Sequence, residues 1–120
     1  MNEFAAAWLA ALRSGKYQQA RGMLRSGDRY CALGVACDLY LQTYGASEWA
    51  QFGANLYDFR WKGKSPRGKA EVPEAVRAAL GMTPRGLVRV VTLNDTRKLP
   101  FSAIADFLES DAPSWIEAQG

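Results

Sequence analysis

The run Tyr30-Cys-Ala-Leu-Gly-Val-Ala-Cys-Asp-Leu-Tyr40 decides how the rest of this chain is interpreted. Its apolar residues recur at the spacing of an α-helix and cover much of the helix circumference, which is typical of a helix surrounded by other elements. Asp28 is a good N-cap before the run, and Gly45 ends the pattern. The sequence therefore predicts a central helix over residues 29–44.

Helical spacing and capping residues predict further helices on both sides of this central segment. The pair Thr83-Pro84 is a helix start signal, although the valines within residues 87–93 favour a strand. We interpret that segment as a helix. Besides the central helix, the predicted helices cover residues 3–13, 16–24, 73–80, 84–93, 102–109 and 111–118.

The best strand in the chain is Leu-Tyr-Asp-Phe-Arg-Trp at residues 56–61, where side chains alternate between two faces. The alternation places Tyr57, Phe59 and Trp61 on one face. A turn-rich loop follows, and residues 70–72 are long enough for a short returning strand. The predicted fold is a helix-rich α+β single domain that spans all 120 residues and contains one small β-hairpin.

The composition excludes several classes of function. The chain contains no histidine, which removes the commonest general base and the commonest metal ligand. Most mechanisms that activate a serine or cysteine nucleophile also need a histidine. We therefore expect no catalytic residue, no metal site and no cofactor.

Two cysteines, Cys31 and Cys37, lie within the central helix. Six helical residues separate their Cα atoms by about 9 Å along the axis, whereas a disulfide needs Cα atoms within about 7 Å. We expect two buried, unlinked thiols in a reducing compartment. The alternative is a reactive Cys31 whose pKa is lowered by its place near the helix N-terminus.

Apolar stretches in the chain are short. Residues 4–12 follow the acidic Glu3 and end at Arg13, so they form the apolar face of a helix and not a signal peptide. No other run is long enough to span a membrane. The expected compartment is the cytoplasm.

Charge is distributed unevenly along the chain. Residues 60–98 hold ten basic and three acidic groups, while residues 99–120 hold four acidic groups and no base. A net charge of +3 for the whole chain therefore conceals a strongly basic middle. Its densest part contains five cations within ten residues, namely Arg60, Lys62, Lys64, Arg67 and Lys69.

This basic segment, residues 60–69, contains the predicted binding site. Cations on a loop beside stackable rings suit single-stranded nucleic acid or a nucleotide, because phosphates meet the cations and bases stack on the rings. The alternative is that the aromatic face of Tyr57, Phe59 and Trp61 packs against the helices, so that charge alone meets the partner. The predicted partner-binding residues are Arg60, Trp61, Lys62, Lys64, Arg67 and Lys69.

Residues 63–69 also come near a phosphate-binding P-loop. Ala70 stands where that motif needs Ser or Thr for Mg²⁺, and the next helix can start only at Pro73. We expect loose anion binding by this loop rather than nucleotide hydrolysis. A helix-turn-helix over residues 84–109 is also excluded, because its linker is eight residues long and its second helix carries no cation.

Asp38 is a carboxylate inside the apolar central helix. If it is buried, this carboxylate needs a partner such as an arginine, and we expect that partner to fix how two helices cross. The role expected for Asp38 is therefore structural.

Three motifs carry a resemblance to a known group. They are the run Tyr-Cys-Ala-Leu-Gly-Val-Ala-Cys-Asp-Leu at 30–39, Val-Pro-x-x-Val at 72–76, and Leu-Asn-Asp at 93–95 followed by Phe-Ser-Ala-Ile-Ala-Asp-Phe-Leu-Glu at 101–109. With these motifs the chain resembles small uncharacterised phage and prophage proteins over most of residues 8–110. The resemblance implies a mobile-element context in a bacterial host, and it carries over no catalytic residue.

These observations together predict a non-enzymatic binding protein of phage or mobile-element type, acting in counter-defence by sequestration or occlusion. Its expected partner is nucleic acid or a nucleotide, met by the basic segment. The alternative is an anti-CRISPR-like inhibitor that binds an acidic surface of a host protein. A third interpretation is a phosphate-chemistry enzyme.

Overall fold

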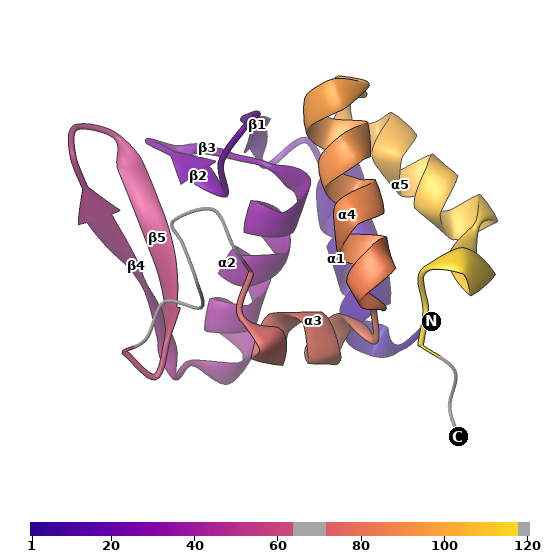
Figure 1. Ribbon diagram of the computed structural model, residues 1–120, viewed down its shortest axis with the longest axis horizontal. Helices are drawn as coiled ribbons and strands as arrows, with labels where there is room; N and C mark the ends of the chain where they lie inside the picture. The colour runs from indigo at the N-terminus through magenta and orange to yellow at the C-terminus, as the bar shows by residue number, and fades with distance from the viewer. Residues whose placement is uncertain (64–71, 118–120) are drawn as a thin grey trace.

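The computed structural model of the chain describes residues 1–63 and 72–117 (Figure 1). Its helices are α1 (Glu3–Arg13), α2 (Ala32–Tyr44), α3 (Glu74–Leu80), α4 (Pro84–Val91) and α5 (Phe101–Ser110). Its strands are β1 (Gln18–Gln19), β2 (Arg25–Ser26), β3 (Arg29–Tyr30), β4 (Ser47–Phe52) and β5 (Leu56–Trp61). A π-helical turn, η1 (Thr92–Thr96), continues α4, and a 3-10 turn, η2 (Ala112–Ser114), follows α5.

The elements form layers, with the sheet on one side of the molecule and most of the helices on the other (Figure 1). Helix α2 lies between the sheet and a group formed by α1, α4 and α5. The strand order is β1-β3-β2-β5-β4; β1 and β3 are parallel, and the other pairs are antiparallel. The prediction of a helix-rich α+β domain is confirmed, but the sheet is larger than the single predicted hairpin.

Helix α2 is central because its N-terminal half is buried on all sides. Every residue over 32–37 is buried. Gly34 is required by this packing, because a Cβ at that position would lie 1.9 Å from the carbonyl oxygen of Leu24. The same carbonyl accepts a hydrogen bond from the Cys31 amide at 3.1 Å. The backbone of Leu24, just before β2, therefore packs directly against the start of α2.

The helix predicted over residues 16–24 is wrong. Those residues form β1 and a bend, and the Ala20 amide donates to the Tyr30 carbonyl at 2.8 Å instead of to a helical neighbour. Gly22 has a φ of +85°, a left-handed conformation that interrupts a helix. Hydrogen bonds to the distant η1 turn outweigh the local helical propensity of this stretch.

Asn94 in η1 provides those hydrogen bonds. Its side chain is buried, and its amide nitrogen donates to the Ala20 carbonyl at 2.9 Å. Its amide oxygen accepts from the Gln19 side chain at 2.9 Å and from the Ala32 amide at 3.2 Å. Asn94 therefore joins β1, the start of α2 and η1, and the Leu-Asn-Asp motif is a packing element of the fold.

The predicted central helix is confirmed, but it begins at Ala32. Cys31 is its N-cap, and the Cys31 sulfur accepts a hydrogen bond from the Gly34 amide at 3.3 Å. Asp28, the predicted N-cap, lies in the turn between β2 and β3. The two residues that follow Asp28 pair with both β1 and β2, and this pairing uses the backbone groups that a helical turn would need. Gly45 ends the helix as predicted.

Strand β5 is confirmed, but its hairpin partner differs from the prediction. The partner is β4, which precedes β5 and pairs with it along its whole length. β4 contains Glu48 and Ala50, residue types depleted in strands, so pairing with β5 decides its conformation. Of the returning strand predicted over residues 70–72, only Val72 lies in the described part of the chain, and it belongs to no strand there.

The helices after the sheet largely follow the prediction. Helix α3 is followed by Gly81 in the left-handed conformation, and α4 begins with Pro84. Residues 87–91 are helical, and the π-helical turn then continues past the break expected at Asn94. The helix predicted over 111–118 is reduced to the turn η2 within the described residues. None of the helices in the described ranges combines the length and apolar character needed to cross a membrane.

Candidate functional site

The predicted binding residues begin at the end of β5. Arg60 is exposed, Trp61 is half-buried, and the Lys62 ammonium lies 4.7 Å from the centre of the Trp61 ring. The Lys62 amide donates to the Ala46 carbonyl at 2.7 Å, which holds the backbone beside the end of α2. The other predicted binding residues, like most of the P-loop-like stretch, lie outside the described part of the chain; they are Lys64, Arg67 and Lys69.

The aromatic face of β5 points toward α2. Phe59 is 1% exposed and packs on Trp49 of β4, with ring centroids 4.8 Å apart. The Trp49 indole nitrogen in turn donates to Asp38 of α2 at 3.1 Å. Tyr57 and Trp61 share this face but are only half-buried. Phe59 therefore belongs to the core, whereas the rings of Tyr57 and Trp61 are partly open.

A second group of aromatic and basic side chains lies on the same face of the sheet. Arg25 places its guanidinium carbon 4.0 Å from the Tyr57 ring centre, 5.2 Å from that of Tyr30 and 5.4 Å from that of Trp49. We call these four residues the Arg25 cluster. It forms because Arg25 pairs with Tyr30 on one side and with Tyr57 on the other.

No direct signal in the sequence indicated the Arg25 cluster. Arg25 follows directly after a segment that was expected to be helical, and the strand that contains it is only two residues long. A two-residue strand has no alternation that a pattern search can detect. The four side chains of the cluster come from four different strands, and only their pairing brings them together.

Asp38 contacts this cluster through Trp49 and binds three neutral donors. Its carboxylate accepts hydrogen bonds from the Tyr17 hydroxyl at 2.7 Å, the Gln42 side chain at 2.8 Å and the Trp49 indole at 3.1 Å. Asp38 therefore has partners, as expected, but they are a hydroxyl, an amide and an indole where an arginine was given as the example. Burial, followed by the hydrogen bond to Asp38, raises the pKa of Tyr17, so this hydroxyl stays protonated and keeps donating.

Both cysteines are buried and unlinked, as predicted. Burial raises the pKa of Cys31 to about 11, and burial also raises the pKa of Cys37 well above its usual value. A reactive thiol needs a lowered pKa and access to solvent. The reactive-thiol alternative for Cys31 is therefore contradicted.

The charged residues divide into paired and unpaired groups. In or beside the strands, four cations form no ion pair with any acidic residue of the described ranges; they are Arg25, Arg29, Arg60 and Lys62. Glu48 lies opposite Arg60 in the β4–β5 register without forming an ion pair with it. Elsewhere in the described ranges, the cations without an ion pair are Lys16, Arg21, Arg85, Arg97 and Lys98. Helix arginines form the observed ion pairs, which are Arg13–Asp106, Arg13–Glu109, Arg77–Glu74, Arg77–Glu117 and Arg89–Asp111.

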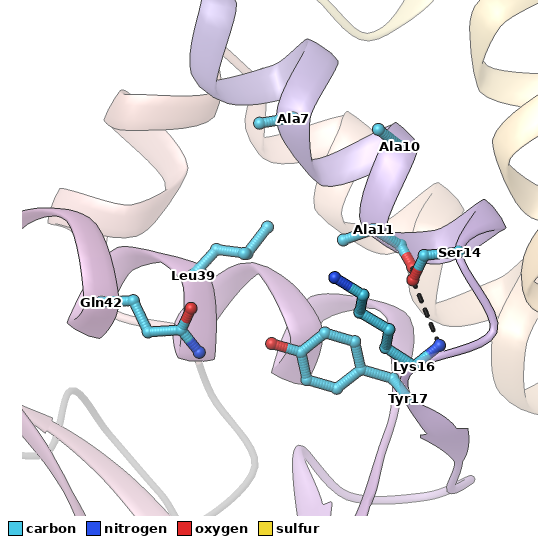
Figure 2. Close-up of a pocket in the computed structure, with 8 residues that line it drawn as sticks. All are labelled: Ala7, Ala10, Ala11, Ser14, Lys16, Tyr17, Leu39 and Gln42. Carbon is cyan, nitrogen blue, oxygen red and sulfur yellow. Dashed lines mark hydrogen bonds between the residues drawn. The ribbon is translucent and has the colours of Figure 1, made fainter.

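A pocket of about 290 Å³ lies between α1 and α2 (Figure 2). The Lys16 side chain reaches into it across the Tyr17 ring, and Lys16 is the charged residue of its described lining. Tyr17 and Gln42 stand at its wall, but both already donate to Asp38. None of the predicted binding residues lines this pocket, whose lining is Ala7, Ala10, Ala11, Ser14, Lys16, Tyr17, Leu39 and Gln42.

Comparison with known proteins identifies one family over nearly the whole chain. A family model described as a domain of unknown function, DUF8296, matches residues 1–112. The matched range includes all five described strands and the helices through α5. No curated protein and no solved structure matches the chain.

Proposed function

The chain belongs to the DUF8296 family, and we propose that it is a non-enzymatic binding protein whose partner is nucleic acid or a nucleotide. It acts by sequestration or occlusion, as a counter-defence protein of a mobile element in the cytoplasm of a bacterial host. The observation that carries the proposal is the group of sheet cations without an acidic partner among the described residues, which are Arg25, Arg29, Arg60 and Lys62.

Unpaired cations support this function because phosphate binding depends on charge that is not already neutralised. Each cation that meets a phosphate releases a counterion and so adds to the affinity. Lys62 lies against the Trp61 ring, whereas the strand alternation directs Arg60 to the opposite face of the sheet. The half-buried Trp61 ring offers part of its surface to a base. The end of β5 therefore supplies charge on both faces of the sheet and a stacking surface on one of them.

Fluorescence anisotropy with a labelled single-stranded oligonucleotide tests the proposal. We expect binding at low salt, with a log–log salt slope of about −2 to −3 if three or four cations meet phosphates. Reversal of both Arg60 and Lys62 to glutamate should weaken binding at least about tenfold. The control is Arg85→Glu with Arg97→Glu, which changes the net charge equally but at α4 and just after η1, and should have the smaller effect.

The proposal fails if the intact protein binds no oligonucleotide or nucleotide at low salt, or if the two double variants weaken binding equally. The rest of the basic segment is part of the proposal, so reversal of Lys62, Lys64 and Arg67 together should abolish binding. Trp61→Ala should weaken binding further if the open part of its ring stacks on a base.

A second candidate function is inhibition of a host protein with an acidic surface, and α4 favours it. Val88 is 67% exposed and Val91 is 45% exposed, and the exposed Arg85 lies one turn before Val88. Apolar side chains gain nothing from phosphates, but they can pack against apolar groups of a protein partner. A bacterial protein that is captured after nuclease treatment, and lost with Val88→Ser and Val91→Ser, would favour this candidate.

The phosphate-chemistry interpretation has a direct test. Purified protein is expected to hydrolyse neither ATP nor GTP above background, because Ala70 cannot supply the hydroxyl that a P-loop uses for Mg²⁺. A Mg²⁺-dependent turnover that disappears in Lys69→Ala would establish an enzyme instead.

A further inference from the structure

The guanidinium group of Arg25 is held in one orientation by its surroundings. Its carbon lies 4.0 Å from the Tyr57 ring centre, and the rings of Tyr30 and Trp49 lie at 5.2 and 5.4 Å. Its Nε donates to the Gly27 carbonyl at 2.7 Å. The side chain is also half-buried, which restricts its rotamers. The group is therefore positioned before any ligand arrives.

The two terminal nitrogens of Arg25 remain for a ligand. Within residues 1–63 and 72–117, the Arg25 side chain makes one hydrogen bond, which is the bond from Nε to Gly27. No carboxylate of these residues forms an ion pair with Arg25. Both terminal nitrogens keep contact with solvent, since neither is among the fully buried side-chain atoms of the described residues that lack a hydrogen-bond partner. Two parallel N–H donors of a guanidinium match two oxygens of a phosphate, and arginine is the preferred residue for this geometry.

Asp38, which is linked to Arg25 through Trp49, does not serve as a partner for the two terminal nitrogens. Asp38 is satisfied by the hydroxyl of Tyr17 and by the side chains of Gln42 and Trp49. Trp49 contacts both charged groups, since its indole nitrogen donates to Asp38 while its ring contacts the Arg25 guanidinium. The charge of Arg25 is therefore available to an external anion.

We infer that Arg25 holds a phosphate group of the ligand through its two terminal nitrogens, with its plane supported by the Tyr57 ring. The inference rests on the proposed function, which names phosphate as the anion, and adds a second contact point away from the end of β5. Tyr57 lies four residues from Trp61 along β5, a separation of about 13 Å. A free nucleotide and the terminal phosphate of a strand share this chemistry.

Titrations followed by NMR test the inference. The probes are inorganic phosphate, a nucleoside monophosphate, and one oligonucleotide with and without a 5′-phosphate. We expect the monophosphate to shift the indole N–H signal of Trp49, assigned with Trp49→Phe, and the Nε–H signal of Arg25. Arg25→Lys keeps the charge but loses the planar pair of donors, so it should bind the monophosphate at least about tenfold more weakly.

Arg97→Gln is the matched control. It removes an exposed cation just after η1, away from the sheet cations, and should change the affinity less than about twofold. Circular dichroism of each variant reports whether it folds. If Arg25→Lys does not fold, the shifts of the intact protein decide the question, because phosphate at Arg25 must move Trp49 and Arg25 signals.

The outcomes separate this inference from the proposed function. If phosphate-bearing probes bind and Arg25→Lys binds them as well as the intact protein, or if shifts occur only around Trp61, the Arg25 site is wrong while nucleic-acid binding stands. If no probe binds at low salt, both are wrong. A preference for the 5′-phosphorylated oligonucleotide that disappears in Arg25→Lys assigns the site to a strand end. An effect limited to the monophosphate assigns it to a free nucleotide.

Discussion

Replacement of Asp38 by alanine measures what the hydrogen-bond network beside the Arg25 cluster contributes to stability. The change removes the acceptor of the Tyr17 hydroxyl at 2.7 Å and of the Trp49 indole at 3.1 Å, both part-buried. Each donor left without a partner costs about 1 to 2 kcal/mol. The Gln42 donor is exposed, so water replaces Asp38 there at little cost. The expected loss is therefore about 3 kcal/mol.

Urea denaturation followed by circular dichroism gives the change in the free energy of unfolding. For a chain of 120 residues, a loss of 3 kcal/mol corresponds to a decrease in Tm of about 12 °C. Asp38→Asn keeps one acceptor oxygen, so it should cost less than Asp38→Ala. A double-mutant cycle with Tyr17→Phe isolates the pair, and we expect a coupling energy of about 1 kcal/mol or more.

The reasoning is refuted if Asp38→Ala costs less than about 0.5 kcal/mol, the range of ordinary surface substitutions. It is also refuted if Asp38→Ala and Tyr17→Phe have additive effects. Additivity would show that the hydroxyl and the carboxylate do not stabilise each other in solution.

Three further predictions concern the core and its titrating groups. Gly34→Ala should cost more than about 3 kcal/mol in urea denaturation, because the added Cβ meets the Leu24 carbonyl at 1.9 Å; near-normal stability would contradict this packing. Cys31 and Cys37 should react slowly with a thiol reagent in the native protein, since burial raises the pKa of both; rapid labelling would disprove their burial. Burial and Asp38 raise the pKa of Tyr17 from its usual 10.0, so this stabilisation is complete below that pH and is lost as the pH rises through the raised pKa. Urea denaturation between about pH 9 and pH 11 should therefore show falling stability, with a smaller fall in Tyr17→Phe; equal falls would contradict the shift.

Much of the fold could be predicted from the sequence because those elements depend on neighbours in the chain. Helix α2 follows from apolar residues at helical spacing and from Gly45 at its end. Strand β5 follows from its alternation of two kinds of side chain. Helix α4 follows from Thr83 and Pro84, whose start signal prevails over the strand preference of the valines.

The candidate site could be predicted only in part. Charge density along the chain points to Arg60 and Lys62, and the aromatic face of the strand adds Trp61; the structure describes all three at the end of β5. Arg25 carries the same charge but stands apart from that segment in the sequence. Its position against Tyr57 depends on a pairing between residues more than thirty apart, which no local pattern reveals.

By itself, the sequence determined the helices, whose backbone hydrogen bonds form within the segment, and the strand whose side chains alternate regularly. These elements are α1, α2, α3, α4, α5 and β5. Only the tertiary structure decided the course of residues 16–31, because two-residue strands gain their hydrogen bonds from other segments. Asn94 illustrates the reason, since it satisfies backbone groups of Ala20 and Ala32 from far along the chain. The partners of Asp38 were decided in the same way, because its neutral donors reach it from Tyr17 and from β4 only after the sheet packs on α2.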